Sequence, residues 1–158
     1  MIESKEATIK VQMTNTYQTP EEAELAFYDA LERHDLKAMM SVWLENDTVA
    51  CVHPGTSRLE GLADIRAGFE QMFEDPAPVM DFTISDTRRQ CLGNVAIHTV
   101  REEIEIGGQL VSVMLATNVF QKTPFGWRML LHHASPEFDF ELDEMDFTLD
   151  HPAPVMLH

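Results

Sequence analysis

Apolar residues recur at helical spacing in the first half of this 158-residue chain. The segment Thr19-Pro20-Glu21-Glu22 has the form of a capping box and predicts a helix that begins at Pro20. Asp35 is a suitable N-cap for a short second helix, and Gly61 precedes a third. The positions expected to face inward are Ala23, Phe27, Ala30 and Leu31, then Leu36, Met39 and Trp43, then Leu62, Ile65, Phe69 and Met72.

The second half of the chain consists of long segments in which apolar and polar residues alternate. A period of two is typical of strands, and the Gly, Asn and Pro residues between the segments predict turns. The four predicted long strands are Val79–Arg88, Val95–Ile106, Leu110–Gln121 and Trp127–Ser135. A shorter, continuously apolar strand is predicted over Thr48–His53. Helices followed by a long meander predict an α+β fold, in which helices cover one face of a curved, mostly antiparallel sheet.

Three parts are expected along the chain: an N-terminal arm over residues 1–19, one domain over residues 20–136 and an acidic tail over residues 137–158. The tail holds seven acidic residues and no lysine or arginine. Five apolar residues alternate with these carboxylates: Phe138, Phe140, Leu142, Met145 and Phe147. This pattern fits an amphipathic strand that docks on the domain and equally a segment that stays mobile.

The charge and the cysteine content limit the partners of the chain. A net charge of −16 argues against nucleic acid and anionic membranes, because both need a positive surface. Cys51 and Cys91 are too few for a disulfide framework and lack zinc-site spacing, so neither a metal nor a cofactor is expected. The start of the chain has no signal-peptide pattern, and no apolar run reaches the roughly 20 residues of a membrane span. We therefore expect a cytoplasmic protein.

The last predicted strand ends in polar residues. A strict period of two places His133 and Ser135 on the same face as Trp127, at the end of an otherwise apolar strip. A polar pair at the end of an apolar strip is typical of a pocket with a reactive or hydrated end. His132 has the opposite parity and is expected at the surface or at an interface.

The order of two helices, strand, helix and curved meander resembles the NTF2-like superfamily over roughly residues 20–136. Three segments carry the resemblance: Trp43–Val49, Val52-His53-Pro54-Gly55 through Leu59-Glu60-Gly61, and Gly126–Ser135. The superfamily includes ketosteroid isomerase, scytalone dehydratase, the SnoaL-type polyketide cyclases and the association domain of calmodulin-dependent kinase II. The resemblance implies a cone around an apolar pocket that binds a small molecule, and a homodimer formed through the outer face of the sheet.

The outer face of the predicted strands supports a covered surface independently of the resemblance. A solvent-exposed sheet face is normally polar, whereas this face carries several apolar residues. They are Val111, Val113, Leu115 and Val119.

The residues of ketosteroid isomerases are only partly matched. The helix tyrosine of that branch falls on Phe27, with Tyr28 one residue away, and the strand acid falls near Asn118. The base falls on Cys51 or, with a short insertion, on His53. Because phenylalanine donates no hydrogen bond, steroid isomerase activity is not expected. His53 and Asn118 nevertheless form a base and an amide donor of the kind that proton abstraction next to a carbonyl requires.

Two sets of site residues follow. The predicted catalytic residues are His53, Asn118 and His133. The predicted pocket lining consists of Phe27, Tyr28, Trp43, Phe69, Met114, Trp127 and Ser135. Each histidine could instead be a structural residue, and the two tryptophans could be ordinary core residues. His98 lies among polar neighbours and is expected at the surface.

Two classes of function stay open. The first is a small-molecule enzyme that catalyses isomerisation, cyclisation or dehydration by proton transfer. The second is a non-catalytic domain that binds a ligand or forms oligomers. A pocket filled by Phe27, Trp43, Phe69 and Phe120 favours the second class, whereas an open pocket into which His53 and His133 project favours the first.

Overall fold

The computed structural model describes residues 16–138, so most of the predicted arm and tail lies outside the described part of the chain. Its helices are α2 (Pro20–Arg33), α3 (Leu36–Val42) and α4 (Gly61–Met72). Its strands are β1 (Ala50–Val52), β2 (Leu59–Glu60), β3 (Asp81–Leu92), β4 (Val95–Ile106), β5 (Gln109–Thr123) and β6 (Gly126–Pro136). None of the described helices is long and apolar enough to cross a membrane.

The first two helices begin at the predicted caps. The Oγ1 atom of Thr19 accepts a hydrogen bond from the backbone N–H of Glu22 at 3.1 Å. Asp35 Oδ1 accepts one from the backbone N–H of Ala38 at 3.0 Å. Between the two helices His34 adopts a left-handed conformation, with φ of 52°, which ends α2 and turns the chain into α3.

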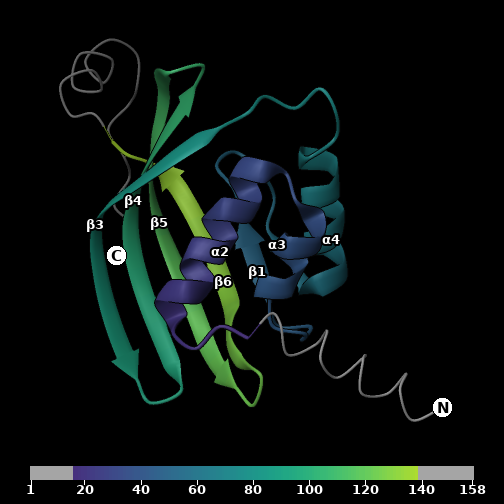
Figure 1. The fold of residues 1–158 in the computed structure, drawn as a ribbon, viewed down its shortest axis with the longest axis vertical. Helices are drawn as coiled ribbons and strands as arrows, with labels where there is room; N and C mark the ends of the chain where they lie inside the picture. Colours follow the sequence, from purple (N-terminus) through teal and green to yellow (C-terminus); the bar gives the residue numbers. More distant parts are fainter. Residues whose placement is uncertain (1–15, 139–158) are drawn as a thin grey trace, which may run out of the picture.

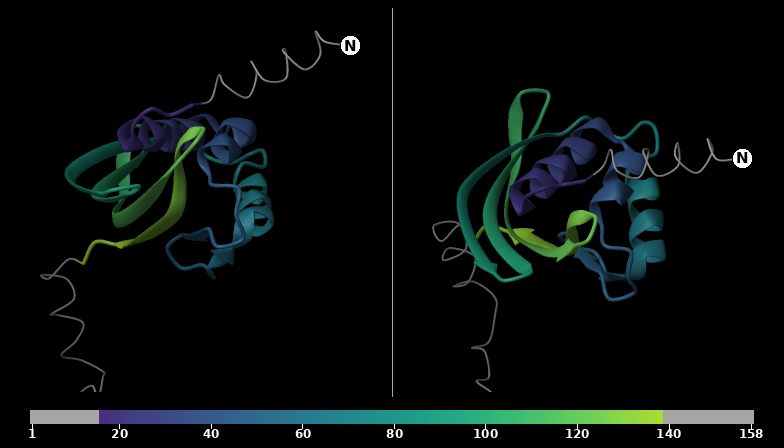
Figure 2. Two further views of the ribbon diagram at one scale, coloured as in Figure 1. Left: turned by 90° about the horizontal axis from the view of Figure 1, so that it is seen from below. Right: turned by 60° about the horizontal axis from the view of Figure 1, so that its bottom comes forward.

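The strands form one curved, unclosed sheet in the order β2-β1-β6-β5-β4-β3. Strand β1 runs parallel to β6, and all other neighbours are antiparallel, so the sheet is mixed. Helix α2 lies across one face of the sheet, and α3 and α4 lie beside the β1 edge (Figures 1 and 2). This arrangement confirms the predicted α+β class and the helix-covered sheet.

Aromatic side chains fill one end of the space between the helices and the sheet. Phe27, Trp43 and Phe69 are buried, with ring centroids 6.3 to 6.5 Å apart in each pair. Phe120 is also fully buried and lies 5.1 Å from the ring of His98. These four residues therefore form a solid part of the core.

A bulge in β6 reverses the predicted faces of its second half. Val119 pairs with Leu131 and Phe120 pairs with Met129, so Leu130 is an extra residue without a partner on β5. Each extra residue in one strand inverts the alternation beyond it. Trp127 and Met129 are buried on the helix side as expected, but beyond the bulge the buried residues are His132 and Ala134.

The expected orientations of three residues in β6 were consequently wrong. His133 and Ser135 are exposed on the outer face of the sheet instead of facing the helices. His132 is 2% exposed on the inner face instead of lying at a surface or an interface. The cause is the single extra residue, because the strand itself begins and ends close to the predicted positions.

Gly126 allows β6 to approach the segment before α2. Its φ is +94°, and a Cβ atom placed on it would lie 2.5 Å from the carbonyl oxygen of Tyr17.

Gly126→Ala is expected to lower the free energy of unfolding by about 2–4 kcal/mol, because the cost of a left-handed backbone at alanine adds to the cost of the steric clash with Tyr17. Urea denaturation measures the loss. Gly93→Ala is the control, since Gly93 has φ of +63° and no atom within 4 Å of such a Cβ. Equal losses in the two variants would contradict the close approach.

Candidate functional site: a buried polar cluster between helix and sheet

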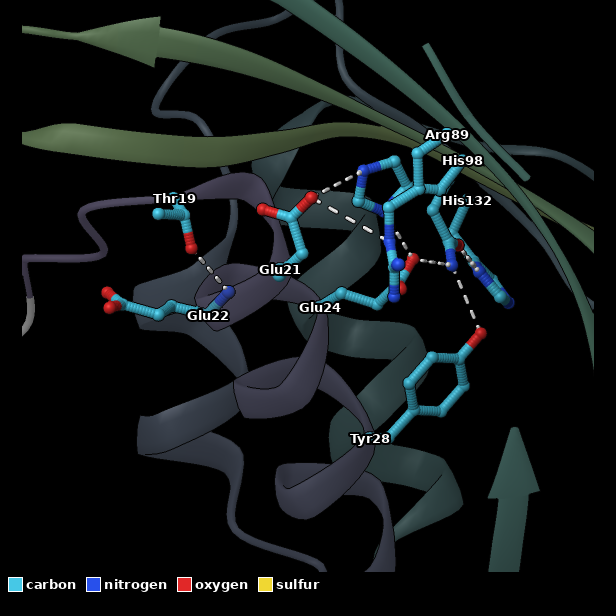
Figure 3. Close-up of polar contacts among 9 residues, drawn as sticks. Thr19, Glu21, Glu22, Glu24, Tyr28, Arg89, His98 and His132 are labelled. Atoms are coloured by element: carbon cyan, nitrogen blue, oxygen red, sulfur yellow. Dashed lines mark hydrogen bonds and ion pairs between the residues drawn. The ribbon is translucent and has the colours of Figure 1, made fainter. Parts of the chain in front are cut away.

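A cluster of polar side chains lies in the interior between α2 and the sheet. Glu24 and Tyr28 come from α2, where a spacing of four residues places them on one face of the helix. His98, Asn118 and His132 stand side by side on β4, β5 and β6, because the register pairs His98 with Asn118 and Asn118 with His132. Figure 3 shows Glu24 and Tyr28 directed toward His98 and His132. All five residues are buried.

The carboxylate of Glu24 is bound from two strands. Its Oε2 atom lies 3.0 Å from Nδ1 of His98 and accepts a hydrogen bond from Nδ2 of Asn118 at 3.0 Å. Because a carboxylate oxygen accepts, Nδ1 of His98 is the protonated ring nitrogen in this contact. The other ring nitrogen of His98 lies 3.8 Å from Oε1 of Glu21, which reaches the surface. The cluster thus has a link to solvent at this end.

The side-chain amide of Asn118 connects the remaining members. Its Nδ2 atom lies 3.1 Å from the hydroxyl oxygen of Tyr28, and its Oδ1 atom lies 2.6 Å from Nδ1 of His132. An amide oxygen only accepts, so His132 donates through Nδ1 and keeps a free lone pair on Nε2. Burial, with smaller effects of His53 and His133, lowers the pKa of His132 to about 3. His132 is therefore a neutral imidazole of one defined tautomer.

Glu102 adds a second carboxyl group to the interior. It lies on β4, four residues after His98 and on the same face, where the register pairs it with Met114 of β5. Burial raises the pKa of Glu102 to about 7, the hydrogen bond from Tyr28 opposes this, and the charge of Glu24 adds to it. Burial, together with the charge of Glu102, raises the pKa of the Tyr28 hydroxyl, which remains protonated and able to donate.

His53 and Cys51 border the cluster from β1. Nε2 of His53 lies 3.4 Å from Sγ of Cys51, and the rings of His53 and His132 have centroids 5.8 Å apart. Burial lowers the pKa of His53 and raises that of the Cys51 thiol to about 12. Both groups are therefore neutral at pH 7, and Cys51 is a buried thiol and not an activated nucleophile.

The predicted site residues divide between the two faces of the sheet. The helix side holds His53 and Asn118 together with Phe27, Tyr28, Trp43, Phe69, Met114 and Trp127. The outer face holds His133 and Ser135, which line a hollow of about 480 Å³ with Arg88, Arg101, Thr99 and Thr117. The structure therefore places both His53 and Asn118 beside His132 and separates His133 from them.

Sequence reasoning missed four members of the cluster: Glu24, His98, Glu102 and His132. His98 was expected at the surface, but it is 1% exposed because its polar neighbours Thr99 and Arg101 belong to the opposite face of β4. Two signals were available. Glu24 lies one helical turn before Tyr28, and His98 and Glu102 share the parity of Ala96 and Val100, which are buried. No group of three His, Cys, Asp or Glu residues within 16–138 is arranged to hold a metal ion.

The sequence and the fold both resemble those of known proteins. The sequence model of the SnoaL-like domain matches residues 21–139. A solved structure from Thiobacillus denitrificans, named as a calcium/calmodulin-dependent protein kinase type II association domain, is 40% identical with a TM-score of 0.68 and covers 78% of this chain and 98% of its own. A structure from Streptomyces avermitilis, named as a dehydratase from the NTF2-like family, is 34% identical with a TM-score of 0.67, covering 74% and 92%.

A relative with a different name covers a similar part of the chain. The F-box protein SKIP8 of Arabidopsis thaliana is 27% identical over 109 residues, which are 69% of this chain and 46% of that protein. The chain therefore spans about half the length of this relative.

The raised pKa of Glu102 predicts a specific pH dependence of stability. The folded protein binds the Glu102 proton more tightly than the unfolded chain, because the pKa rises from 4.5 to about 7. The associated stabilisation is complete below the unfolded pKa and is lost as pH rises through the folded one. Glu102→Gln stays neutral, so between about pH 4 and about pH 8 it is expected to gain up to about 3 kcal/mol relative to the wild type. Urea denaturation across this pH range measures the difference. If the free energies of unfolding of the wild type and of Glu102→Gln change in parallel with pH, the prediction is wrong.

Proposed function

This chain belongs to the SnoaL-like family of the NTF2-like superfamily, and we propose that it binds an apolar small molecule bearing a carbonyl or hydroxyl group and transfers a proton on it. The observation that carries the proposal is the position of the Glu102 side chain, which is buried on the inner face of β4 between Ile84 and Met114. A carboxyl group with a pKa of about 7 both donates and accepts protons near neutral pH, which is the requirement for a general acid or base.

The neighbours of Glu102 supply the other parts of such a site. The Tyr28 hydroxyl accepts a hydrogen bond from the Asn118 amide at 3.1 Å and keeps its own proton to donate, so Tyr28 can bind an oxygen atom on which negative charge develops. His53 is also a neutral imidazole, but its ring packs against Phe69, so it borders the filled end of the interior. His132 positions Asn118 through its hydrogen bond to Oδ1. These roles suit isomerisation, cyclisation or dehydration, and the 34% identical relative is named as a dehydratase.

The apolar part of the ligand belongs at one end of the interior. The register pairs Glu102 with Ile84 on one side and with Met114 on the other, and both side chains are only half-buried, as is Phe82. The opposite end is filled by the aromatic core around Phe27 and Phe69. We therefore assign the ligand to the space bordered by Phe82, Ile84 and Met114, with its oxygen toward Tyr28.

Deuterium exchange tests the proposed chemistry directly. A panel of cyclic ketones is incubated with the protein in D2O, and exchange at the carbon next to the carbonyl is followed by NMR. Glu102→Gln is expected to slow the exchange of any active ketone by about 10²-fold or more, the usual contribution of a general acid or base. Glu103→Gln is the control, because Glu103 lies on the outer face and contacts Arg101. An unchanged rate in Glu102→Gln, or no exchange with any ketone, would refute the proposed role.

A second function is supported by the outer face of the sheet, which we propose as a homodimer interface. Leu115 is 46% exposed there, and Val113, Val119 and Leu131 beside it are only half-buried. An apolar sheet face of this kind normally packs against another surface. The 40% identical relative is named as an association domain, which supports a role in assembly with or without catalysis. The two free thiols fit a reducing compartment, and we place the protein in the cytoplasm.

The dimer is tested by one charged substitution in the apolar surface. Leu115→Glu is expected to convert the dimer to a monomer in light scattering, because the interface would have to remove a carboxylate from water. Leu25→Glu is the matched control, since Leu25 is 72% exposed on α2, away from the sheet's outer face. A monomeric wild type, or a Leu115→Glu variant of unchanged mass, would contradict this interface.

A further inference from the structure

Glu32 lies at the border of the space that is assigned to the ligand. It follows Tyr28 by four residues on α2, so the two side chains share one face of the helix. Its Oε1 atom accepts a hydrogen bond from the backbone N–H of Phe82 at 2.8 Å, and Phe82 is one of the half-buried residues that border the space. The rings of Phe82 and Tyr28 have centroids 5.7 Å apart. Glu32 therefore stands beside the aromatic wall of the site.

The carboxylate of Glu32 has no cationic partner in the described part of the chain. Within residues 16–138, no lysine or arginine forms an ion pair with Glu32 or with the buried Glu102. The Phe82 N–H occupies one of the roughly four acceptor positions that a carboxylate offers. Glu32 can therefore accept further hydrogen bonds, and a positively charged donor makes the strongest ones.

The interior beyond Glu32 also contains acidic groups. Glu24 and Glu102 are both buried, at 5% and 3% exposure. Burial raises the pKa of Glu102, the hydrogen bond from Tyr28 opposes this, and the charge of Glu24 adds to it. Burial and the charge of Glu102 likewise raise the pKa of Cys51. The influence of these carboxyl groups thus reaches across the interior, where a negative potential attracts a cation and repels an anion.

We propose that the ligand carries a positively charged nitrogen in addition to its oxygen atom, and that the nitrogen binds at Glu32 while the oxygen faces Tyr28. An aliphatic ammonium group suits this position, because it pairs with a carboxylate and is attracted to aromatic rings such as those of Tyr28 and Phe82. A ligand that carries a carboxylate or a phosphate is repelled from the same position. The inference rests on the ligand space of the proposed function, but not on the transfer of a proton.

Two alcohols of the same shape test the charge preference. The cation 4-hydroxy-1,1-dimethylpiperidinium differs from the neutral 4,4-dimethylcyclohexanol by a nitrogen in place of a carbon, and its charge does not depend on pH. Their dissociation constants are measured by NMR titration of the full-length protein. The cation is expected to bind at least about tenfold more tightly than the neutral alcohol, a factor equivalent to about 1.4 kcal/mol.

Glu32→Gln tests whether this carboxylate selects the cation. The glutamine keeps an oxygen that can accept from the Phe82 N–H and removes the negative charge, so the preference is expected to fall to about twofold or less. Glu70→Gln is the control, because Glu70 is exposed on α4 and its replacement removes the same charge. This control is expected to keep the wild-type preference, which separates binding at Glu32 from a general attraction to a chain of net charge −16.

The inference is overturned if the cation does not bind, or if the wild type binds the two alcohols equally. It is also overturned if Glu32→Gln keeps the wild-type preference or if Glu70→Gln loses it. The deuterium exchange of ketones tests the proton transfer separately. A preference for the cation without any exchange would therefore support this class of ligand and refute the proposed chemistry.

Discussion

The burial of the Glu24 carboxylate is the constraint on which the interior of this protein depends. A buried carboxylate is strongly unfavourable unless hydrogen-bond donors surround it, and here the donors come from two neighbouring strands of the sheet. Their geometry fixes which nitrogen of His98 carries the proton and which way the Asn118 amide points. The orientation of Asn118 in turn fixes the tautomer of His132. One helix residue therefore determines how one polar side chain on each of three strands, His98, Asn118 and His132, is protonated or oriented.

The sequence was sufficient for the fold but not for the site, and β6 illustrates the difference. Strand and helix positions follow from periodicity, because each element must bury one face, and Thr19 and Asp35 cap the helices that the pattern predicted. Alternation predicts the face of each side chain only where every residue of the strand pairs with one residue of the neighbouring strand. The extra residue Leu130 breaks this count, and nothing in the alternation of the sequence marks it. The predicted faces of His132 and His133 were consequently the reverse of the observed ones.

The missing members of the cluster have a second cause. Glu24 contacts His98 and Asn118, which are 74 and 94 residues away along the chain. A polar residue read alone is assigned to the surface, because an unpaired buried charge is disfavoured. Only the three-dimensional pairing shows that the partners exist. Local sequence patterns therefore predicted the apolar core well, whereas the polar interior needed the register of three strands and the position of α2.

The interior changes character from one end to the other, and this gradient explains why proton chemistry is assigned to Glu102 and not to Glu24. Glu24 lies near the aromatic core, where His98 and Asn118 satisfy its oxygen. Glu102 lies further along β4, between half-buried apolar residues, and its burial there raises its pKa. Glu102 takes no part in the hydrogen bonds that His98 and Asn118 make to Glu24. The first carboxyl group therefore organises the fold, and the second is the one free to change its protonation state.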